Sequence, residues 1–168
     1  MIETGYPFQF VGTSTIGTDQ YLLDTLVYAF QSEKSGHQYQ VNIERYVEHL
    51  CGVKFFDQTT NVRTGKFSNL SATNEPRVIF RTVSSIALDA YRRDPLSSFF
   101  LIGAADSRDR KSTTTRRFRV YASFVNNLNL THLFRIIELK NQSMIILLNR
   151  KAVTDVDAYM QHILDFVT

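Results

Sequence analysis

Apolar positions in the first third of the chain predict four β-strands, over residues 6–11, 21–31, 38–43 and 52–57. Residues 38–43 alternate apolar and polar positions with a period of two, and residues 21–31 are rich in aromatic and β-branched residues. The first segment looks like an edge strand, because Pro7 has no N–H to donate to a neighbouring strand and fits only at an edge or at the start of a strand. A Ser-Gly turn signal within residues 32–37 predicts that the second and third segments form an antiparallel hairpin. Residues 43–51 fit both helical spacing and a strand.

Helical and strand patterns alternate along the rest of the chain. Apolar stripes with helical spacing predict helices over residues 75–93, over 113–126 and from 154 onward. Apolar or alternating runs predict strands over residues 96–104, 131–139 and 144–148. The run 96–104 is almost continuously apolar, as in a central strand that is covered on both faces. A long polar loop, 57–75, connects the first strands to the first helix.

Capping residues and apolar stripes define the expected helices more closely. Thr73 or Asn74 would cap the first helix, and Thr154 would cap the last. The second helix would be opened by a hydroxyl residue, which is one of Ser112, Thr113, Thr114 and Thr115. The stripes expected to be buried are Ile79, Val83, Ile86, Ala87 and Ala90 in the first helix, and Phe118, Tyr121, Ala122 and Val125 in the second.

These elements predict an α+β fold in a single domain over residues 1–168. A mixed β-sheet would begin with N-terminal antiparallel hairpin strands and continue in the order α-β-α-β-β-α. A chain of 168 residues is long enough to bury a sizeable core. Its content of 43% hydrophobic and 21% charged residues is ordinary for a globular domain and far from that of disordered chains.

Composition also narrows the class of protein. Cys51 is the only cysteine, which excludes an intrachain disulfide and argues against a structural zinc site. The apolar runs 99–102 and 144–148 are too short to cross a bilayer, and no signal-peptide pattern is visible. We therefore expect a cytoplasmic protein that makes no membrane contact. Because the net charge is only +3, only a local cluster of cations would point to a charged partner.

Such a cluster lies between Arg108 and Arg119, a stretch that contains six positively charged residues and one acidic residue. A turn that enters a helix offers free N–H groups and a partial positive charge to an anion. The residues expected to bind an anion or a nucleic acid are Ser107, Arg108, Arg110, Lys111, Thr114, Arg116, Arg117 and Arg119. Two structural alternatives remain open, namely a solvated basic helix face and internal pairing of Arg117 with Asp106 or Glu138.

Other residues suggest different chemistry. Asp106 and Asp109 follow the central strand at a spacing that suits a divalent metal, as in a metal-dependent nuclease. Cys51 lies two residues after His49, but a lone cysteine is far more often a small core residue than a nucleophile. The segment lacks the glycines and the Gly-Lys-Ser/Thr ending of a P-loop, and no cofactor is expected.

Several short motifs resemble a group of uncharacterised small bacterial proteins, known as domains of unknown function. They are V-Y-A-F at 27–30, T-V-S-S-I-A at 82–87, a strand ending near Gly103, and R-F-R-V-Y at 117–121, which is similar to the group's R-x-R-[LV]-Y. The resemblance covers about residues 26–124 and brings no activity with it. It implies a bacterial protein in which the helix start at 117–121 matters, and an accessory of toxin–antitoxin or phage-defence systems would fit.

The sequence therefore favours a binding protein that is not an enzyme, with nucleic acid or an acidic protein as partner. Contact would be made mostly to phosphate, so binding would be weakly sequence-specific and strongly salt-dependent. The alternatives are a nuclease that uses Asp106, Asp109 and Arg117, and a self-assembly or interaction module. The module would add a strand to the edge at residues 8–11, which would give a homo-oligomer or a complex.

Overall fold

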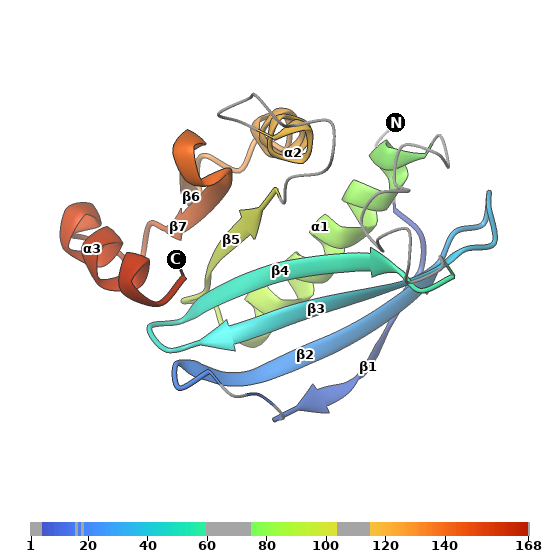
Figure 1. Ribbon diagram of the computed structural model, residues 1–168, viewed down its shortest axis with the longest axis horizontal. Coiled ribbons are helices and arrows are strands. Elements are labelled where there is room, and N and C mark those ends of the chain that lie inside the picture. The colour runs from blue at the N-terminus through green and yellow to red at the C-terminus, as the bar shows by residue number, and fades with distance from the viewer. Residues whose placement is uncertain (1–4, 16, 18, 60–74, 104–114, 168) are drawn as a thin grey trace.

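The structure is a computed structural model that describes residues 5–15, 17, 19–59, 75–103 and 115–167 (Figure 1). These residues form one mixed sheet of seven strands, with three α-helices, in the α+β layout that the sequence predicts. Most of the predicted polar loop 57–75, namely residues 60–74, lies outside the described residues. None of the helices in the described ranges is long and apolar enough to cross a membrane.

The N-terminal half of the sheet is an antiparallel meander. Its strands are β1 (Phe8–Ser14), β2 (Leu22–Gln31), β3 (Gln38–Tyr46) and β4 (Leu50–Asp57). The predicted hairpin of β2 and β3 is therefore confirmed, and β1 is an edge strand as Pro7 suggests. The ambiguous segment 43–51 contains a tight turn between β3 and β4. In that turn Glu48 and His49 adopt positive φ angles of 64° and 57°, which non-glycine residues rarely do.

The rest of the chain completes the sheet and supplies the helices. In chain order the elements are α1 (Pro76–Arg93), β5 (Ser98–Ile102), α2 (Arg116–Asn127), β6 (Phe134–Leu139), a short 3-10 turn at Lys140–Gln142, β7 (Met144–Asn149) and α3 (Val156–Val167). The strand order is β1-β2-β3-β4-β5-β7-β6, and only the β4–β5 pair is parallel. Helix α1 makes the crossover between those two parallel strands.

Helices cover both faces of the sheet around β5. Phe99 packs in a core with Ile79 of α1 and Phe118 of α2. Phe100 packs in a second core with Ile163 of α3. Neighbouring residues of a strand point to opposite faces, so α1 and α2 lie on one side of the sheet and α3 on the other (Figure 1). The prediction of a central strand covered on both faces is therefore confirmed.

The predicted caps are right for one helix and wrong for two. Thr115 caps α2, and its Oγ1 accepts from the Phe118 N–H at 3.0 Å. The N-cap of α1 is Glu75 instead of Thr73 or Asn74, which lie outside the described residues. Glu75 is buried here because hydroxyl groups satisfy its carboxylate, including those of Ser32 at 2.7 Å and Ser35 at 3.0 Å.

At the start of α3 the capping residue is Asp155 instead of Thr154. Asp155 Oδ1 accepts from the Ala158 N–H at 3.1 Å, and the Asp155 carbonyl accepts from the Tyr159 N–H at 3.1 Å. A carboxylate next to the positive end of the helix dipole is a better cap than a hydroxyl one residue earlier. The apolar stripe predicted for this helix is nevertheless in place, with Ile163 fully buried.

Candidate functional site

The basic residues predicted to bind an anion are only partly described. Arg116, Arg117 and Arg119 occupy the first turn of α2, where Arg116 and Arg119 are exposed and Arg117 is half-buried. Each of the three also makes an interaction within the protein. The other predicted residues, Ser107, Arg108, Arg110, Lys111 and Thr114, lie outside the described residues, as do Asp106 and Asp109.

Hydrogen bonds join Gly103 to Thr115 and to Ser143. Thr115 Oγ1 donates to the Gly103 carbonyl at 2.6 Å, and the Gly103 N–H donates to the Ser143 carbonyl at 2.8 Å. The Thr115 N–H is 3.4 Å from Ser143 Oγ, and both Thr115 and Ser143 are buried. This clamp fixes the start of α2 beside the carboxyl end of β5, where open α/β sheets tend to place ligands.

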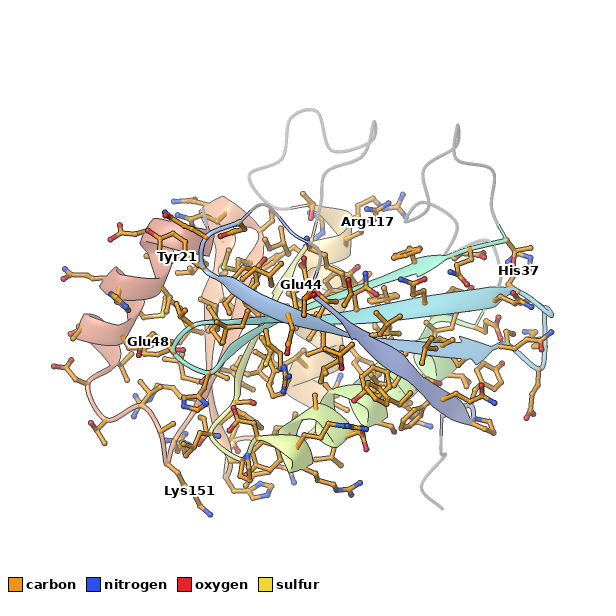
Figure 2. The ribbon with its side chains drawn as sticks, turned by 90° about the horizontal axis from the view of Figure 1, so that it is seen from below. Tyr21, His37, Glu44, Glu48, Arg117 and Lys151 are labelled. Carbon is orange, nitrogen blue, oxygen red and sulfur yellow. The ribbon has the colours of Figure 1, made fainter. Side chains whose placement is uncertain are left out.

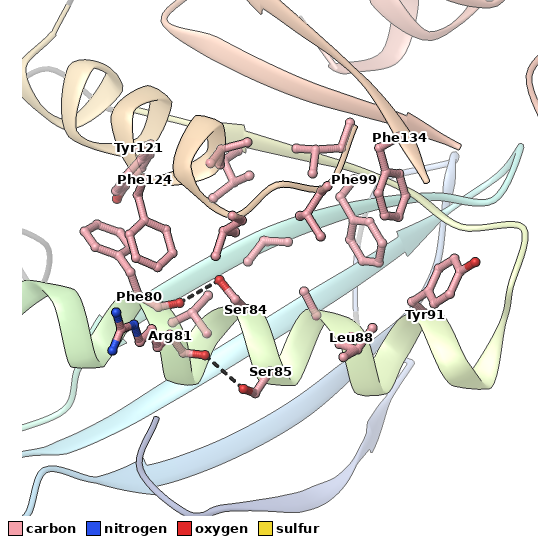
Figure 3. A pocket seen from close by; sticks show the side chains of 18 of the residues that line it. Phe80, Arg81, Ser84, Ser85, Leu88, Tyr91, Phe99, Tyr121, Phe124 and Phe134 are labelled. Carbon is pink, nitrogen blue, oxygen red and sulfur yellow. Dashed lines mark hydrogen bonds between the residues drawn. The ribbon is translucent and has the colours of Figure 1, made fainter. Parts of the chain in front are cut away.

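A groove lies between α1 and α2 on the same face of the sheet (Figure 3). Its volume is about 400 Å³. Helix α1 forms one wall, α2 and the leucines that follow it form the other, and β4, β5 and β7 form the floor. Representative side chains are Ala87 and Leu88 from α1, Phe124 and Leu128 from the opposite wall, and Val53 and Leu147 from the floor.

Aromatic pairs close both ends of the groove. At one end the ring of Phe80 lies 5.3 Å from that of Tyr121 and 5.0 Å from that of Phe124. At the other end the ring of Phe134 lies 5.7 Å from that of Tyr91 and 5.9 Å from that of Phe99. Three of these pairs are edge to face and the Phe80–Phe124 pair is tilted, so packed rings support both ends of a groove that holds no ligand.

Few polar groups reach this apolar surface. Arg81 is the only charged side chain among the described residues that line the groove, and it is half-buried. The hydroxyls of Ser84 and Ser85 donate to the carbonyls of Phe80 and Arg81 at 2.8 and 3.0 Å, within α1 itself. Their protons are thus already used, and the serines present mainly a small, compact surface.

Tyr121 connects the groove to the basic start of α2. Burial raises the pKa of its phenol to about 12, and the positive charge of Arg117, one helical turn earlier, acts in the opposite direction. Phe118 and Tyr121 are both buried, as the predicted stripe requires, so neither ring is available to stack on a base. Arg81 of α1 lines the Phe80 end of the groove, and Arg117 of α2 lies one helical turn before Tyr121 at the same end.

The suggested pairing of Cys51 with His49 does not make a nucleophilic site. Cys51 is buried, and burial raises the pKa of its thiol to about 11. His49 instead places Nδ1 2.6 Å from Oδ2 of Asp94, and Arg45 pairs with Asp24 at 2.5 Å in the same polar cleft. A thiol that stays protonated at neutral pH is a core residue, as the sequence favours. In the described part of the chain, no three histidine, cysteine or acidic side chains gather as metal ligands would.

Sequence reasoning missed the groove, although one signal was present. Leu128 and Leu130 follow α2 outside any predicted element, and Leu133 lies near the start of the predicted strand 131–139; all three line the groove while remaining half-buried. Apolar residues that cluster in a loop indicate that this loop packs against another apolar surface of the protein.

The resemblance to small bacterial domains stays a prediction. No protein-family model, curated protein or solved structure matches this chain.

Proposed function

We propose that the protein binds a small, largely apolar molecule in the groove between α1 and α2. The observation that carries this proposal is the preformed apolar space itself, whose volume of about 400 Å³ lies within the range of small-molecule sites. Its walls come from a helix, a second helix and the sheet, each anchored in the core beneath. The site is therefore held in shape by the fold.

The chemistry of the lining favours binding over catalysis. The described lining residues offer apolar contacts, two serines, tyrosines and one guanidinium. Transfer of apolar surface out of water gains about 25 cal/mol per Å², so a ligand that fills the groove is held mainly by the hydrophobic effect. This proposal keeps the expectation of a cytoplasmic protein that acts by binding, but its contact surface is the groove and not the basic residues.

The first test uses Nile red, an uncharged dye whose emission rises and shifts to the blue in apolar sites. We expect the protein to bind the dye with micromolar affinity. Ala87→Phe, which places a ring in the groove, should weaken binding at least about tenfold, because the volume gained by the side chain is lost to the dye.

The matched control is Ala158→Phe, the same substitution at an exposed position of α3. It should leave dye binding unchanged. Circular dichroism and thermal melting establish that both variants fold. If the wild type does not bind the dye, or if both variants bind it equally well, the groove is not the site.

A second candidate function is the binding of an anionic polymer, nucleic acid or acidic protein, at the start of α2. The clamp between Gly103, Thr115 and Ser143 supports it, because this clamp fixes the helix start that carries Arg116 and Arg119, both exposed. The nuclease that would use Asp106 and Asp109, and the module that would use the β1 edge, stay predictions.

For this second function we expect Arg116→Ala to weaken binding of a single-stranded oligonucleotide and to lower the slope of log affinity against log salt by about one. Lys151→Ala removes one positive charge elsewhere, since Figure 2 shows Lys151 far from the α2 position marked by Arg117. It should leave the slope unchanged. Fluorescence anisotropy over a salt series measures the affinity and its slope for each variant. An affinity that does not change with salt concentration would rule out the phosphate contact.

A further inference from the structure

We infer that the ligand of the groove is a long-chain anion, with an unbranched apolar tail along the groove and one acidic group at the Arg81 end. This inference rests on the proposed function and adds the chemical class and the orientation of the ligand. The features behind it are the uneven distribution of charge along the groove, its shape, and the nature of its two ends.

Charge is confined to one end of the groove. Figure 3 shows Arg81 beside Phe80, Tyr121 and Phe124, with Tyr91 and Phe134 at the opposite end. No acidic side chain occurs among the described residues that line the groove. Arg117 adds a second positive charge near Tyr121, as its effect on the pKa of that phenol shows. Arg81 and Arg117 each already interact with a group within the protein. The inference therefore depends on the position of their positive charges and not on unpaired N–H donors.

The position of Arg81 gives that charge more influence than a surface arginine would have. Its side chain is half-buried at the end of the groove where Phe80 and Phe124 lie, and water screens charge less there than it does in the open. A guanidinium also stays positively charged at any ordinary pH. An acidic head group at this end therefore gains Coulomb energy, which an uncharged alcohol does not.

The shape of the groove favours a chain over a compact ring system. The lining follows α1 from Phe80 to Tyr91, which corresponds to about 16 Å at the rise of an α-helix. Between the aromatic ends the walls carry aliphatic side chains such as Leu88, Val125 and Leu128. A flexible alkyl chain fills an elongated apolar space of this kind and still leaves its head group at one end.

A phosphate polymer does not fit this space. Its charges repeat along the whole backbone, while the far end and the floor of the groove are apolar, and Phe99, Leu147 and Phe134 would desolvate charges without offering partners. Nucleic acid would have to bind outside the groove. The lining therefore favours a ligand that carries a single charge at one end.

The experiment compares dodecanoate with dodecanol, which have the same chain and differ in the head group. Each is titrated, below the concentration at which it aggregates, against the protein loaded with Nile red. We expect dodecanoate to displace the dye at about tenfold lower concentration than dodecanol, as one charge-assisted contact allows. Arg81→Gln should remove this preference by weakening dodecanoate while leaving dodecanol unchanged.

Two further variants make the test specific. Arg81→Lys keeps the charge and should retain most of the preference for dodecanoate. Arg92→Gln removes a charge from the exposed last turn of α1, outside the groove, and should leave the preference intact. Equal displacement by acid and alcohol, or a preference that survives Arg81→Gln, would overturn the long-chain anion while leaving the apolar site standing. Failure of Nile red itself to bind would overturn the site as well.

Discussion

Gly103→Ala is expected to destabilise the protein by about 3 kcal/mol or more and to abolish binding of Nile red. A Cβ atom at residue 103 would lie 2.4 Å from the backbone nitrogen of Phe118 and 2.7 Å from its Cα. These are backbone atoms of the first turn of α2, so no side-chain rotation can relieve the overlap. Either β5 or α2 must move, and both contribute to the groove.

The hydrogen bonds around Gly103 increase this cost. Its carbonyl accepts from Thr115 Oγ1, and its N–H donates to the Ser143 carbonyl. If α2 shifts to make room for the methyl group, the buried hydroxyl of Thr115 loses its acceptor and α2 loses the geometry of its cap. The expected loss of dye binding follows from displacement of α2, the wall that carries Tyr121, Phe124 and Val125.

Urea denaturation measures the change in the free energy of unfolding. The control is Gly17→Ala at an exposed position, where an added Cβ comes closest to Cδ2 of Leu22, at 2.9 Å, and that side-chain end can rotate away. Gly17→Ala should cost much less and should bind Nile red like the wild type. A Gly103→Ala protein with wild-type stability and dye affinity would mean that α2 does not sit against residue 103 in solution.

The order of elements was predictable because each one carries a local signal. The alternation of Tyr39, Val41 and Ile43 defines β3, and all three are buried on one face. The stripe of α1 is buried at Ile79, Val83, Ile86 and Ala90 as expected. Its remaining member, Ala87, is only half-buried because it faces the groove, a property that spacing along one helix does not reveal.

The turn between β3 and β4 shows a different limit. Glycine or asparagine normally marks a two-residue turn with positive φ, but Glu48 and His49 occupy this one. Distant groups hold them there. The His49 carbonyl accepts from the Ser98 N–H at 2.9 Å, and the Glu48 carbonyl accepts from Tyr159 Oη of α3 at 3.1 Å. Tertiary contacts of this kind leave no mark in the local sequence.

The candidate site was the least predictable part. The density of arginine was plain in the sequence, and the structure does place Arg116, Arg117 and Arg119 at the start of a helix. The groove depends instead on the spacing between two helices that are separated in the chain by β5 and the basic segment. Its residues come from two helices, four strands and the segments beside them, each of which shows only ordinary core composition by itself.

Asn149→Ala is expected to destabilise the protein by about 4 kcal/mol, since it would remove four hydrogen bonds made by one buried side chain, one of them to the carbonyl of buried Ser97. Asn149 is 2% exposed, at the end of β7. Its Nδ2 donates to the carbonyls of Pro95 at 2.8 Å and Ser97 at 3.1 Å. Its Oδ1 accepts from the N–H groups of Lys151 at 3.0 Å and Ala152 at 3.3 Å.

One amide side chain thus joins the corner between α1 and β5 to the turn that leads to α3, and alanine can replace none of these bonds. The matched variant is Asn127→Ala, because Asn127 is exposed and its Nδ2 donates to the Ser123 carbonyl within α2. It should change the free energy of unfolding by less than about 0.5 kcal/mol. If urea denaturation showed equal effects for the two variants, water would be reaching the corner, and Asn149 would not be what fixes β5 beneath the groove.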